Sequence, residues 1–252
     1  MTADLSGQIA VVTGATSGLG LRFAQVLSAH GAAVAITGRR AERLDALKTE
    51  LEGKGGKVLC IPSDLTQTED ILRVVEATEA ELGTPTILIN NAGMADAKYA
   101  TKIDIDFFDQ VLSLNVRAPF LLAREVAKRL IAAKRPGRIV NLASIMAYHY
   151  EGQGAALYST TKAAVVRMTE TLAVEWAKFH INVNAIAPGY VQSEMTDAMS
   201  ERMGGADLSQ IYPRKRLPSP DMLDSTLLFL VDPASHGVTG TVVKMDDGQT
   251  PR

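Results

Sequence analysis

Short apolar runs alternate with segments of helical periodicity along the first part of the chain, and this alternation constrains the fold more than any other feature. The runs predict strands, the periodic segments predict helices, and glycines stand where two of the helices end. The predicted order is a strand at 8–12, a helix through Leu21 and Leu27 to Gly31, a strand at 33–37, a helix at 41–51, a strand at 57–61, a helix at 68–82 and a strand at 86–89. Strands that alternate with helices favour one parallel, doubly wound α/β sheet with helices on both faces.

The second part of the chain continues the pattern with longer helices. It predicts a helix at 104–133 that bends at Pro119, a strand at 138–142, a helix that ends near Phe179, a strand at 181–187, a helix at 221–231 and a last strand at 241–245. No repeat, low-complexity tract or linker interrupts it, so we expect residues 1–252 to form a single domain.

Composition argues against several classes of function. A net charge of −2 gives no basic excess for nucleic acid, and no apolar run reaches the length of a membrane span. The chain begins without the basic start and apolar stretch of a secretion signal, and its one cysteine, Cys60, cannot form an internal disulfide. No cluster of His, Cys and acidic residues predicts a metal site. We therefore expect a cytoplasmic protein that binds neither nucleic acid nor a membrane.

A glycine-rich turn joins the first strand to the first helix. Its sequence is Thr13-Gly14-Ala15-Thr16-Ser17-Gly18-Leu19-Gly20. Glycines let a backbone approach a pyrophosphate closely, and a helix N-terminus offers free N–H groups to an anion. A glycine turn can also be merely tight, but its position between strand and helix favours a phosphate site.

The residues that follow the second predicted strand indicate which dinucleotide the chain prefers. Folds that prefer NAD place an acid about 20 residues past the glycines, where it binds the ribose 2′-hydroxyl. Here Gly38 and Arg39 stand at that place, and an arginine can bind a 2′-phosphate with paired hydrogen bonds. The sequence favours NADP(H), with NAD(H) possible. The alternative interpretation is a solvated basic start to the next helix.

A tyrosine and a lysine stand four residues apart, at Tyr158 and Lys162, in a predicted helix. At this spacing they share one face, and a neighbouring ammonium favours the phenolate, which lowers the pKa of a tyrosine and suits it to proton transfer near neutral pH. The same pair could equally be a packed tyrosine and a solvated lysine, so the motif gains weight only from the rest of the chain.

Taken together, the motifs resemble those of the short-chain dehydrogenase/reductase family, in its order and at its spacings. They are Thr13-Gly14-x-x-x-Gly18-x-Gly20, Asn90-Asn91-Ala92-Gly93, Asn115, Ser144, Tyr158-x-x-x-Lys162 and Pro188-Gly189. The resemblance implies a single Rossmann-type domain with a seven-stranded parallel sheet. It also implies hydride transfer between NADP(H) or NAD(H) and a carbonyl or secondary alcohol.

The resemblance assigns four catalytic residues. Tyr158 is the general acid or base, and Lys162 lowers its pKa and binds the nicotinamide ribose. Ser144 binds the substrate oxygen, and Asn115 orders a water molecule that links Lys162 to solvent. The resemblance, together with the phosphate site expected at the glycine turn and the 2′-phosphate site expected at Arg39, gives a set of cofactor-binding residues. They are Gly14, Thr16, Ser17, Gly18, Leu19, Gly20, Arg39, Asp64, Leu65, Asn91, Ala92, Gly93, Tyr158, Lys162, Pro188, Gly189, Val191 and Ser193.

The predicted substrate surface is apolar and aromatic, which suggests an apolar or cyclic ketone. Its residues are Met94, Met146, Tyr148, His149, Tyr190 and Met195. Met195, Met199 and Met203 recur at helical spacing within a segment, about 190–215, that we expect either to cover the cleft as a lid or to pack in the core.

Several alternatives stay open from the sequence. Among the nearest relatives by resemblance are 3-oxoacyl-carrier-protein reductases and sugar-acid dehydrogenases; Arg135 matches a carrier-binding position of the first group, but Phe179 stands where a second basic residue is expected. The chain could also be an NAD(H)-dependent alcohol dehydrogenase, or a dinucleotide-binding regulatory protein without turnover. Resemblance further implies a homotetramer or homodimer.

Overall fold

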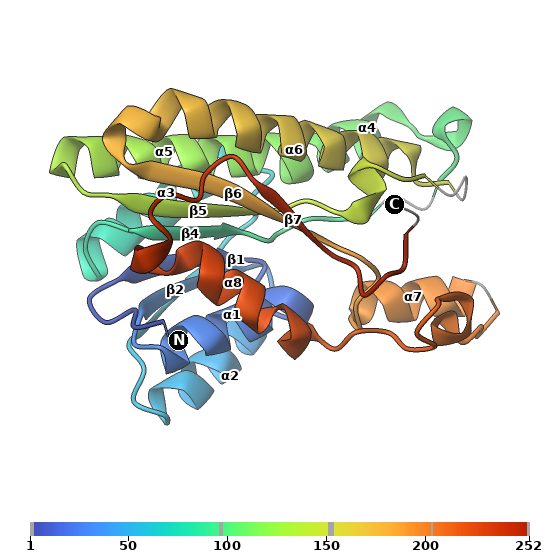
Figure 1. Ribbon diagram of the computed structural model, residues 1–252, viewed down its shortest axis with the longest axis horizontal. Coiled ribbons are helices and arrows are strands. Elements are labelled where there is room, and N and C mark those ends of the chain that lie inside the picture. The colour runs from blue at the N-terminus through green and yellow to red at the C-terminus, as the bar shows by residue number, and fades with distance from the viewer. Residues whose placement is uncertain (1–2, 96–97, 151–153, 203, 251–252) are drawn as a thin grey trace.

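The computed structural model describes residues 3–95, 98–150, 154–202 and 204–250. Seven parallel strands form one sheet in the order β3-β2-β1-β4-β5-β6-β7 (Figure 1), as the alternation and the resemblance predict. The strands are β1 (Ile9–Thr13), β2 (Ala33–Gly38), β3 (Val58–Pro62), β4 (Ile87–Asn90), β5 (Gly137–Leu142), β6 (Ile181–Pro188) and β7 (Val242–Met245). Most are nearly continuous apolar runs, because helices cover both faces of the sheet.

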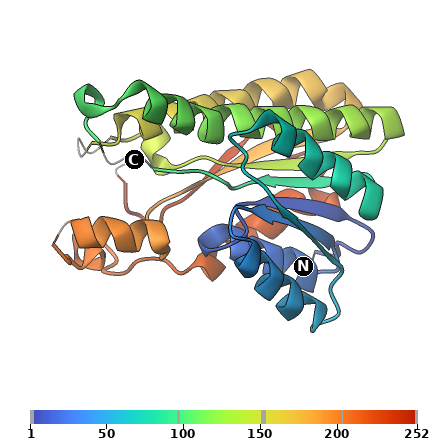
Figure 2. The ribbon, with the colours of Figure 1, turned by 180° about the vertical axis from the view of Figure 1, so that it is seen from behind.

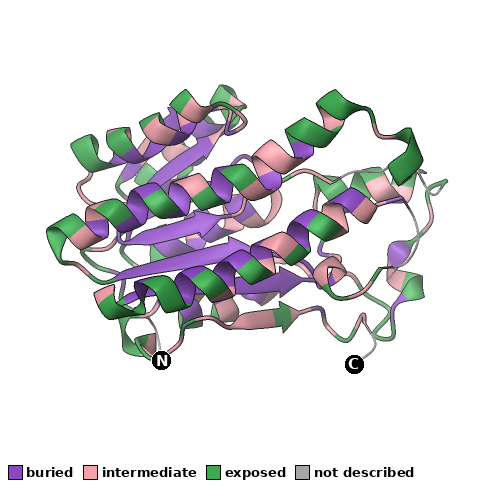
Figure 3. Cartoon of the chain, turned by 90° about the horizontal axis from the view of Figure 1, so that it is seen from above, coloured by how far each residue is buried: buried purple, intermediate pink, exposed green. Residues whose placement is uncertain are grey.

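The helices divide between the two faces of the sheet (Figures 1 and 2). One face packs on α1 (Gly18–Ala29), α2 (Ala41–Glu52) and α8 (Asp224–Val231), and the other on α3 (Thr68–Glu81), α5 (Ala118–Ala133) and α6 (Ala156–Trp176). In Figure 3, which looks onto one face of the molecule, buried and exposed residues alternate along the helices, and the strands beneath them are buried. No helix among the described residues is long and apolar enough to cross a bilayer.

The strand order reverses between β1 and β4, which lie side by side with Val11 opposite Leu88. The chain leaves β1 toward β2 and leaves β4 toward β5, so the loops after β1 and β4 diverge at this point. A crevice at the carboxyl ends of the strands is therefore expected here, and this is the usual ligand position in an open parallel sheet.

The single helix predicted over 104–133 is divided in the structure. Asp104 caps α4 (Ile105–Leu112) by accepting the N–H of Phe107, a π-helical turn spans Ser113–Arg117, and α5 begins at Ala118. The reason is Pro119, which has no N–H to donate to the carbonyl of Asn115 four residues earlier. The predicted bend is thus a widened turn, and it contains Asn115.

The segment between β6 and α8 extends beyond the carboxyl ends of the strands and carries α7 (Glu194–Arg202) (Figure 1). The ring of Tyr190, just after β6, stacks on the ring of Tyr212 further along the segment, with centroids 5.5 Å apart. The C-terminal segment binds this segment at two places: the Gln249 side chain bonds to the backbone N–H and C=O of Tyr190, and Asp247 pairs with Arg214 and Arg216. Met203, expected in the same helical series as Met195, lies outside the described residues.

Candidate active site

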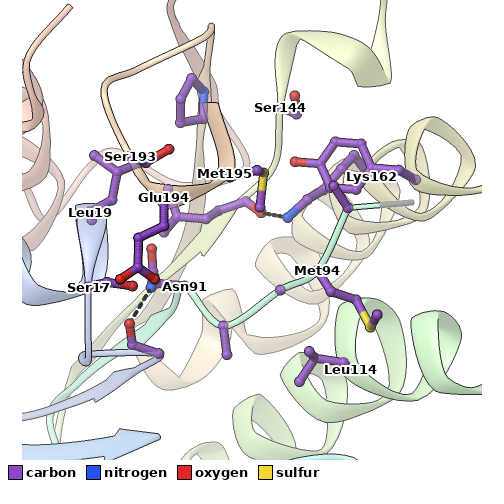
Figure 4. A pocket seen from close by; sticks show the side chains of 18 of the residues that line it. Ser17, Leu19, Asn91, Met94, Leu114, Ser144, Lys162, Ser193, Glu194 and Met195 are labelled. Carbon is purple, nitrogen blue, oxygen red and sulfur yellow. Dashed lines mark hydrogen bonds between the residues drawn. The ribbon is translucent and has the colours of Figure 1, made fainter. Parts of the chain in front are cut away.

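One cleft of about 770 Å³ lies beyond the carboxyl ends of β1 to β6, and α7 forms one wall of it (Figure 4). Most residues predicted from the sequence line it: Gly14, Thr16, Ser17, Gly18, Leu19, Arg39, Asp64, Leu65, Asn91, Ala92, Gly93, Met94, Ser144, Met146, Tyr158, Lys162, Pro188, Gly189, Tyr190, Val191, Ser193 and Met195. Four predicted residues are outside the lining: Gly20, Asn115, Tyr148 and His149.

Lys162 is a buried cation beside Tyr158. Its Nζ lies 5.5 Å from the centroid of the Tyr158 ring and donates a 2.6 Å hydrogen bond to the carbonyl oxygen of Leu142, at the end of β5. Only 5% of Lys162 is exposed, and this burial lowers the pKa of Lys162 to about 8, because a buried ammonium loses its hydration. The ammonium therefore remains the majority form at pH 7.

Asn115 lies behind the cleft and ties the loop after β4 to α6. Its Oδ1 accepts the N–H of Met94 at 2.9 Å, and its Nδ2 donates to the carbonyl of Met94 at 2.8 Å and to Thr161 Oγ1 at 3.1 Å. The Thr161 hydroxyl donates in turn to the carbonyl of Tyr158 at 2.7 Å. The carboxamide thus bonds to protein groups on both sides and fixes the turn of α6 that carries Tyr158.

Ser144 ends the loop after β5 and begins a short 3₁₀ turn on the cleft wall. Its Oγ accepts the N–H of Met146 at 3.2 Å. Ser159, next to Tyr158 on α6, donates a 2.5 Å hydrogen bond to the carbonyl of Met146. The first bond orders the loop after β5 and the second joins this loop to the first turns of α6. Ser144 and Tyr158 therefore line the same cleft.

The glycine turn approaches the loop after β4 so closely that side chains are excluded. Gly14 has a φ of +67°, and a Cβ there would lie 2.9 Å from Asn91 Nδ2 and 3.0 Å from Ala92 Cα. The side chain of Ser17, at the N-terminus of α1, makes no capping bond, so the first-turn N–H groups remain available to an anion.

Gly20 lies behind this turn rather than in the cleft. A Cβ at Gly20 would lie 2.3 Å from both Gly14 O and Asn91 Nδ2, so the missing side chain lets α1 pack against the strand ends. Asn91 completes the junction by donating from Nδ2 to the carbonyls of Thr13 and Gly14, at 2.9 and 3.3 Å.

The two arginines after β2 differ in their surroundings. Arg39 is exposed and lines the cleft, and its guanidinium makes no ion pair or hydrogen bond with any residue that the structure describes. Arg40 is bound on both sides: Nη2 donates to Thr16 Oγ1 and to Ser17 Oγ, each at 2.8 Å, and Nη1 pairs with Glu194 at 3.0 Å. The charge pattern after β2 predicts a cofactor role for Arg39 and gives none to Arg40, although the two arginines are adjacent in the sequence.

Glu194, the first residue of α7, is the acid of this region. It pairs with Arg40 and with Arg43 of α2, and these bonds hold the pKa of the Glu194 carboxyl well below its usual range, at about 2. Its side chain extends from α7 into the cleft on the side of Ser17 (Figure 4). No sequence pattern identifies this residue, because its partners are more than 150 positions away.

The predicted substrate residues separate into two groups. Met94, Met146, Tyr190 and Met195 line the cleft, and Met199 and Leu114 join them. Tyr148 lies outside the lining, about half exposed, with Lys244 Nζ 4.1 Å from the centroid of its ring. His149 also lies outside the lining. The apolar end of the cleft is therefore rich in methionine, a side chain that adapts to varied shapes.

Both the sequence and the fold match known proteins. The family model of the short chain dehydrogenases matches residues 8–204. The chain is 35% identical over 248 residues to the gluconate 5-dehydrogenase of Gluconobacter oxydans, covering 98% of this chain and 96% of that protein. It is also 35% identical over 245 residues to a 3-oxoacyl-(acyl-carrier-protein) reductase of Rickettsia bellii, covering 97% and 98%.

A solved structure resembles the whole chain. It is a Beutenbergia cavernae protein described as an NAD(P)-dependent gluconate 5-dehydrogenase with bound NADP. It is 32% identical, with a TM-score of 0.91, and the match covers 99% of both chains.

Proposed function

This chain belongs to the short-chain dehydrogenase family, and from that premise we propose that it transfers a hydride between NADP(H) and a ketone or secondary alcohol. The observation that carries the proposal is the Lys162 ammonium, buried 5.5 Å from the Tyr158 ring in the cleft that also holds the glycine turn. A protein that only bound a dinucleotide would not need to pair a buried cation with a phenol there.

The residues of the cleft fit a dinucleotide with a 2′-phosphate. The turn at Gly14 has no room for a Cβ, the first turn of α1 has no cap from Ser17, and Arg39 has a guanidinium without a partner among the described residues. These groups would hold the pyrophosphate and the 2′-phosphate. The Beutenbergia cavernae relative was solved with NADP, which supports the same preference. NAD(H) remains the alternative cofactor.

Proton transfer belongs to the chain's own residues. When bound, the nicotinamide supplies or accepts the hydride. In the reductive direction, Tyr158 donates its phenolic proton to the carbonyl oxygen, and Ser144 donates a hydrogen bond to the same oxygen as negative charge develops on it. The Lys162 ammonium stabilises the phenolate that Tyr158 leaves behind. In the oxidative direction Tyr158 acts as the base.

Asn115 acts in this proposal as a positioning residue. Its carboxamide already bonds to Met94 and Thr161, so the side chain holds the cleft walls together. Pro119 has no N–H to donate to the backbone carbonyl of Asn115. We propose that this carbonyl instead accepts a hydrogen bond from the water molecule that links Lys162 to solvent.

The substrate we propose is a ketone or alcohol with an apolar part, because one end of the cleft is lined by apolar and aromatic side chains. They are Met94, Met146, Tyr190, Met195 and Met199. The segment at about 190–215 would act as its lid. The curated relatives act on sugar acids and on acyl groups carried by a protein, according to their names, and they are equally similar to this chain. Similarity therefore does not choose between these substrates.

We also propose that the chain is a cytoplasmic homotetramer or homodimer. Large apolar side chains are exposed on α4, α5 and α8, at Phe108, Phe120 and Phe229, where burial in a partner would stabilise an assembly. Light scattering of the purified protein tests the oligomeric state.

A panel of reactions tests the proposal. Simple and cyclic ketones, sugar acids and 3-oxoacyl thioesters would be assayed with NADPH and with NADH by loss of nicotinamide absorbance. We expect turnover with at least one carbonyl class and a preference for NADPH. Tight dinucleotide binding with no turnover on any class would instead support the regulatory alternative.

A further inference from the structure

Glu194 binds two arginines, Arg40 and Arg43, that neighbour Arg39 in the chain, the residue proposed above to hold the 2′-phosphate. It bonds through both carboxylate oxygens to Arg40, at 3.2 and 3.0 Å, and also pairs with Arg43. Arg40 in turn donates to the hydroxyls of Thr16 and Ser17 in the glycine turn. One acid from α7 thus closes a polar network over the point where β2 ends and α1 begins.

The position of Glu194 is fixed by the turn that precedes α7. Thr196 Oγ1, which is buried, donates to the carbonyl of Val191 at 3.0 Å and accepts the N–H of Ser193 at 2.9 Å. The backbone on both sides of Glu194 is therefore tied down within a few residues. The carboxylate reaches the arginines from an ordered turn rather than from a free loop.

The charges around this point favour a competing anion. Arg39 and Arg40 line the cleft after β2, and Arg43 stands on the first turns of α2. Glu194, which pairs with Arg40 and Arg43, supplies one negative charge against these three arginines. A 2′-phosphate carries more charge than a carboxylate and can bind a guanidinium through paired hydrogen bonds. The phosphate and the carboxylate cannot both take the same donors of Arg40.

Resting on the proposed function, we propose that Glu194 is a specificity-determining residue that weakens the binding of a 2′-phosphorylated adenosine by occupying Arg40 and Arg43. Binding of NADP(H) displaces the carboxylate from these arginines, whereas NAD(H), which lacks the phosphate, leaves it in place. Glu194 therefore reduces the preference for NADP(H) that the arginines create and brings the two cofactors closer in affinity.

Two small probes isolate this effect without catalysis. Adenosine 2′,5′-bisphosphate and adenosine 5′-monophosphate differ only in the 2′-phosphate, and calorimetry gives a dissociation constant for each. Glu194→Gln keeps the size of the side chain and removes its charge. Asp197→Asn is the matched control: it removes the other negative charge of the first turn of α7, and the Asp197 carboxylate has no ion pair among the described residues.

Glu194→Gln should lower the dissociation constant of the bisphosphate by about 3- to 10-fold, the scale of one or two exposed ion pairs, and leave that of the monophosphate unchanged. Asp197→Asn should change the ratio of the two constants by less than about 2-fold, since a charge so exposed is screened. The same order should appear for NADPH against NADH in binding titrations of the wild type and both variants.

Equal effects of the two substitutions, or a weaker bisphosphate affinity in Glu194→Gln, would overturn this inference and leave the proposed function intact. Failure of the wild type to bind either probe or either dinucleotide would overturn both.

Discussion

Replacing Lys162 by methionine should abolish activity without destabilising the cofactor-free protein at pH 7. Methionine keeps an unbranched apolar side chain of similar length and removes the buried ammonium. The pKa of that ammonium falls from 10.5 to about 8 in the folded protein. This difference corresponds to about 3 kcal/mol by which the charged form disfavours folding at neutral pH.

The substitution also removes the donor to the carbonyl of Leu142. A buried carbonyl without a partner costs about 1 to 3 kcal/mol. The two effects oppose each other, so at pH 7 the free energy of unfolding of Lys162→Met should lie between that of the wild type and about 2 kcal/mol above it.

The pH dependence separates the two effects. In the wild type the unfavourable contribution of Lys162 is complete below pH 8 and is lost as the pH rises through the folded pKa toward 10.5, because the unfolded chain then holds more protons than the folded chain. Wild-type stability relative to Lys162→Met should therefore rise by about 2 kcal/mol between pH 7 and pH 10.

Urea unfolding of both proteins, at the same protein concentration, can be followed by the fluorescence of Trp176, the only tryptophan of the chain. A variant less stable than the wild type by more than about 1 kcal/mol at pH 7 would contradict this balance between the desolvation of Lys162 and its hydrogen bond. So would a stability difference that does not change between the two pH values.

Two further substitutions test other parts of the site. Arg39→Gln should weaken the binding of NADPH by about 10- to 100-fold and the binding of NADH by less than about 3-fold, because charged hydrogen bonds to the 2′-phosphate are lost. Equal weakening of both affinities in binding titrations would show that Arg39 does not bind the phosphate. Gly20→Ala should destabilise the fold by about 1 to 3 kcal/mol in urea unfolding, since its Cβ would lie 2.3 Å from Gly14 O. Gly237→Ala, whose Cβ would meet nothing within 4 Å, is the control, and similar losses in both would contradict the packing role of Gly20.

The sheet was predictable from the sequence because strand and helix periodicities are local signals. The apolar run at 86–89 and the periodic segment at 68–82 correspond to β4 and α3, and each boundary agrees within one residue. The long helix at 104–133 was not divided correctly, because a proline predicts that regular bonding must change but not how. The chain resolves it with a π-helical turn at Ser113–Arg117.

Residues of the site were predictable where spacing or glycine content marks them. Tyr158 and Lys162 meet because a helix places residues four apart on one face, and Gly14 is marked by its turn. Arg40 and Glu194 could not be paired from the sequence, since their contact depends on how the segment after β6 folds over β2. Tyr148 and His149 follow Ser144 closely, but the short 3₁₀ turn after that serine carries them out of the cleft lining.

The central claim is that Tyr158 transfers the proton to or from the substrate oxygen, and Tyr158→Phe tests it most directly. Phenylalanine keeps the ring beside Lys162 and removes only the hydroxyl. We expect the turnover number on the best substrate of the panel to fall by about 10²- to 10⁴-fold, with the NADPH dissociation constant unchanged within about 3-fold. Turnover within about 10-fold of the wild type, with NADPH still bound, would contradict the account.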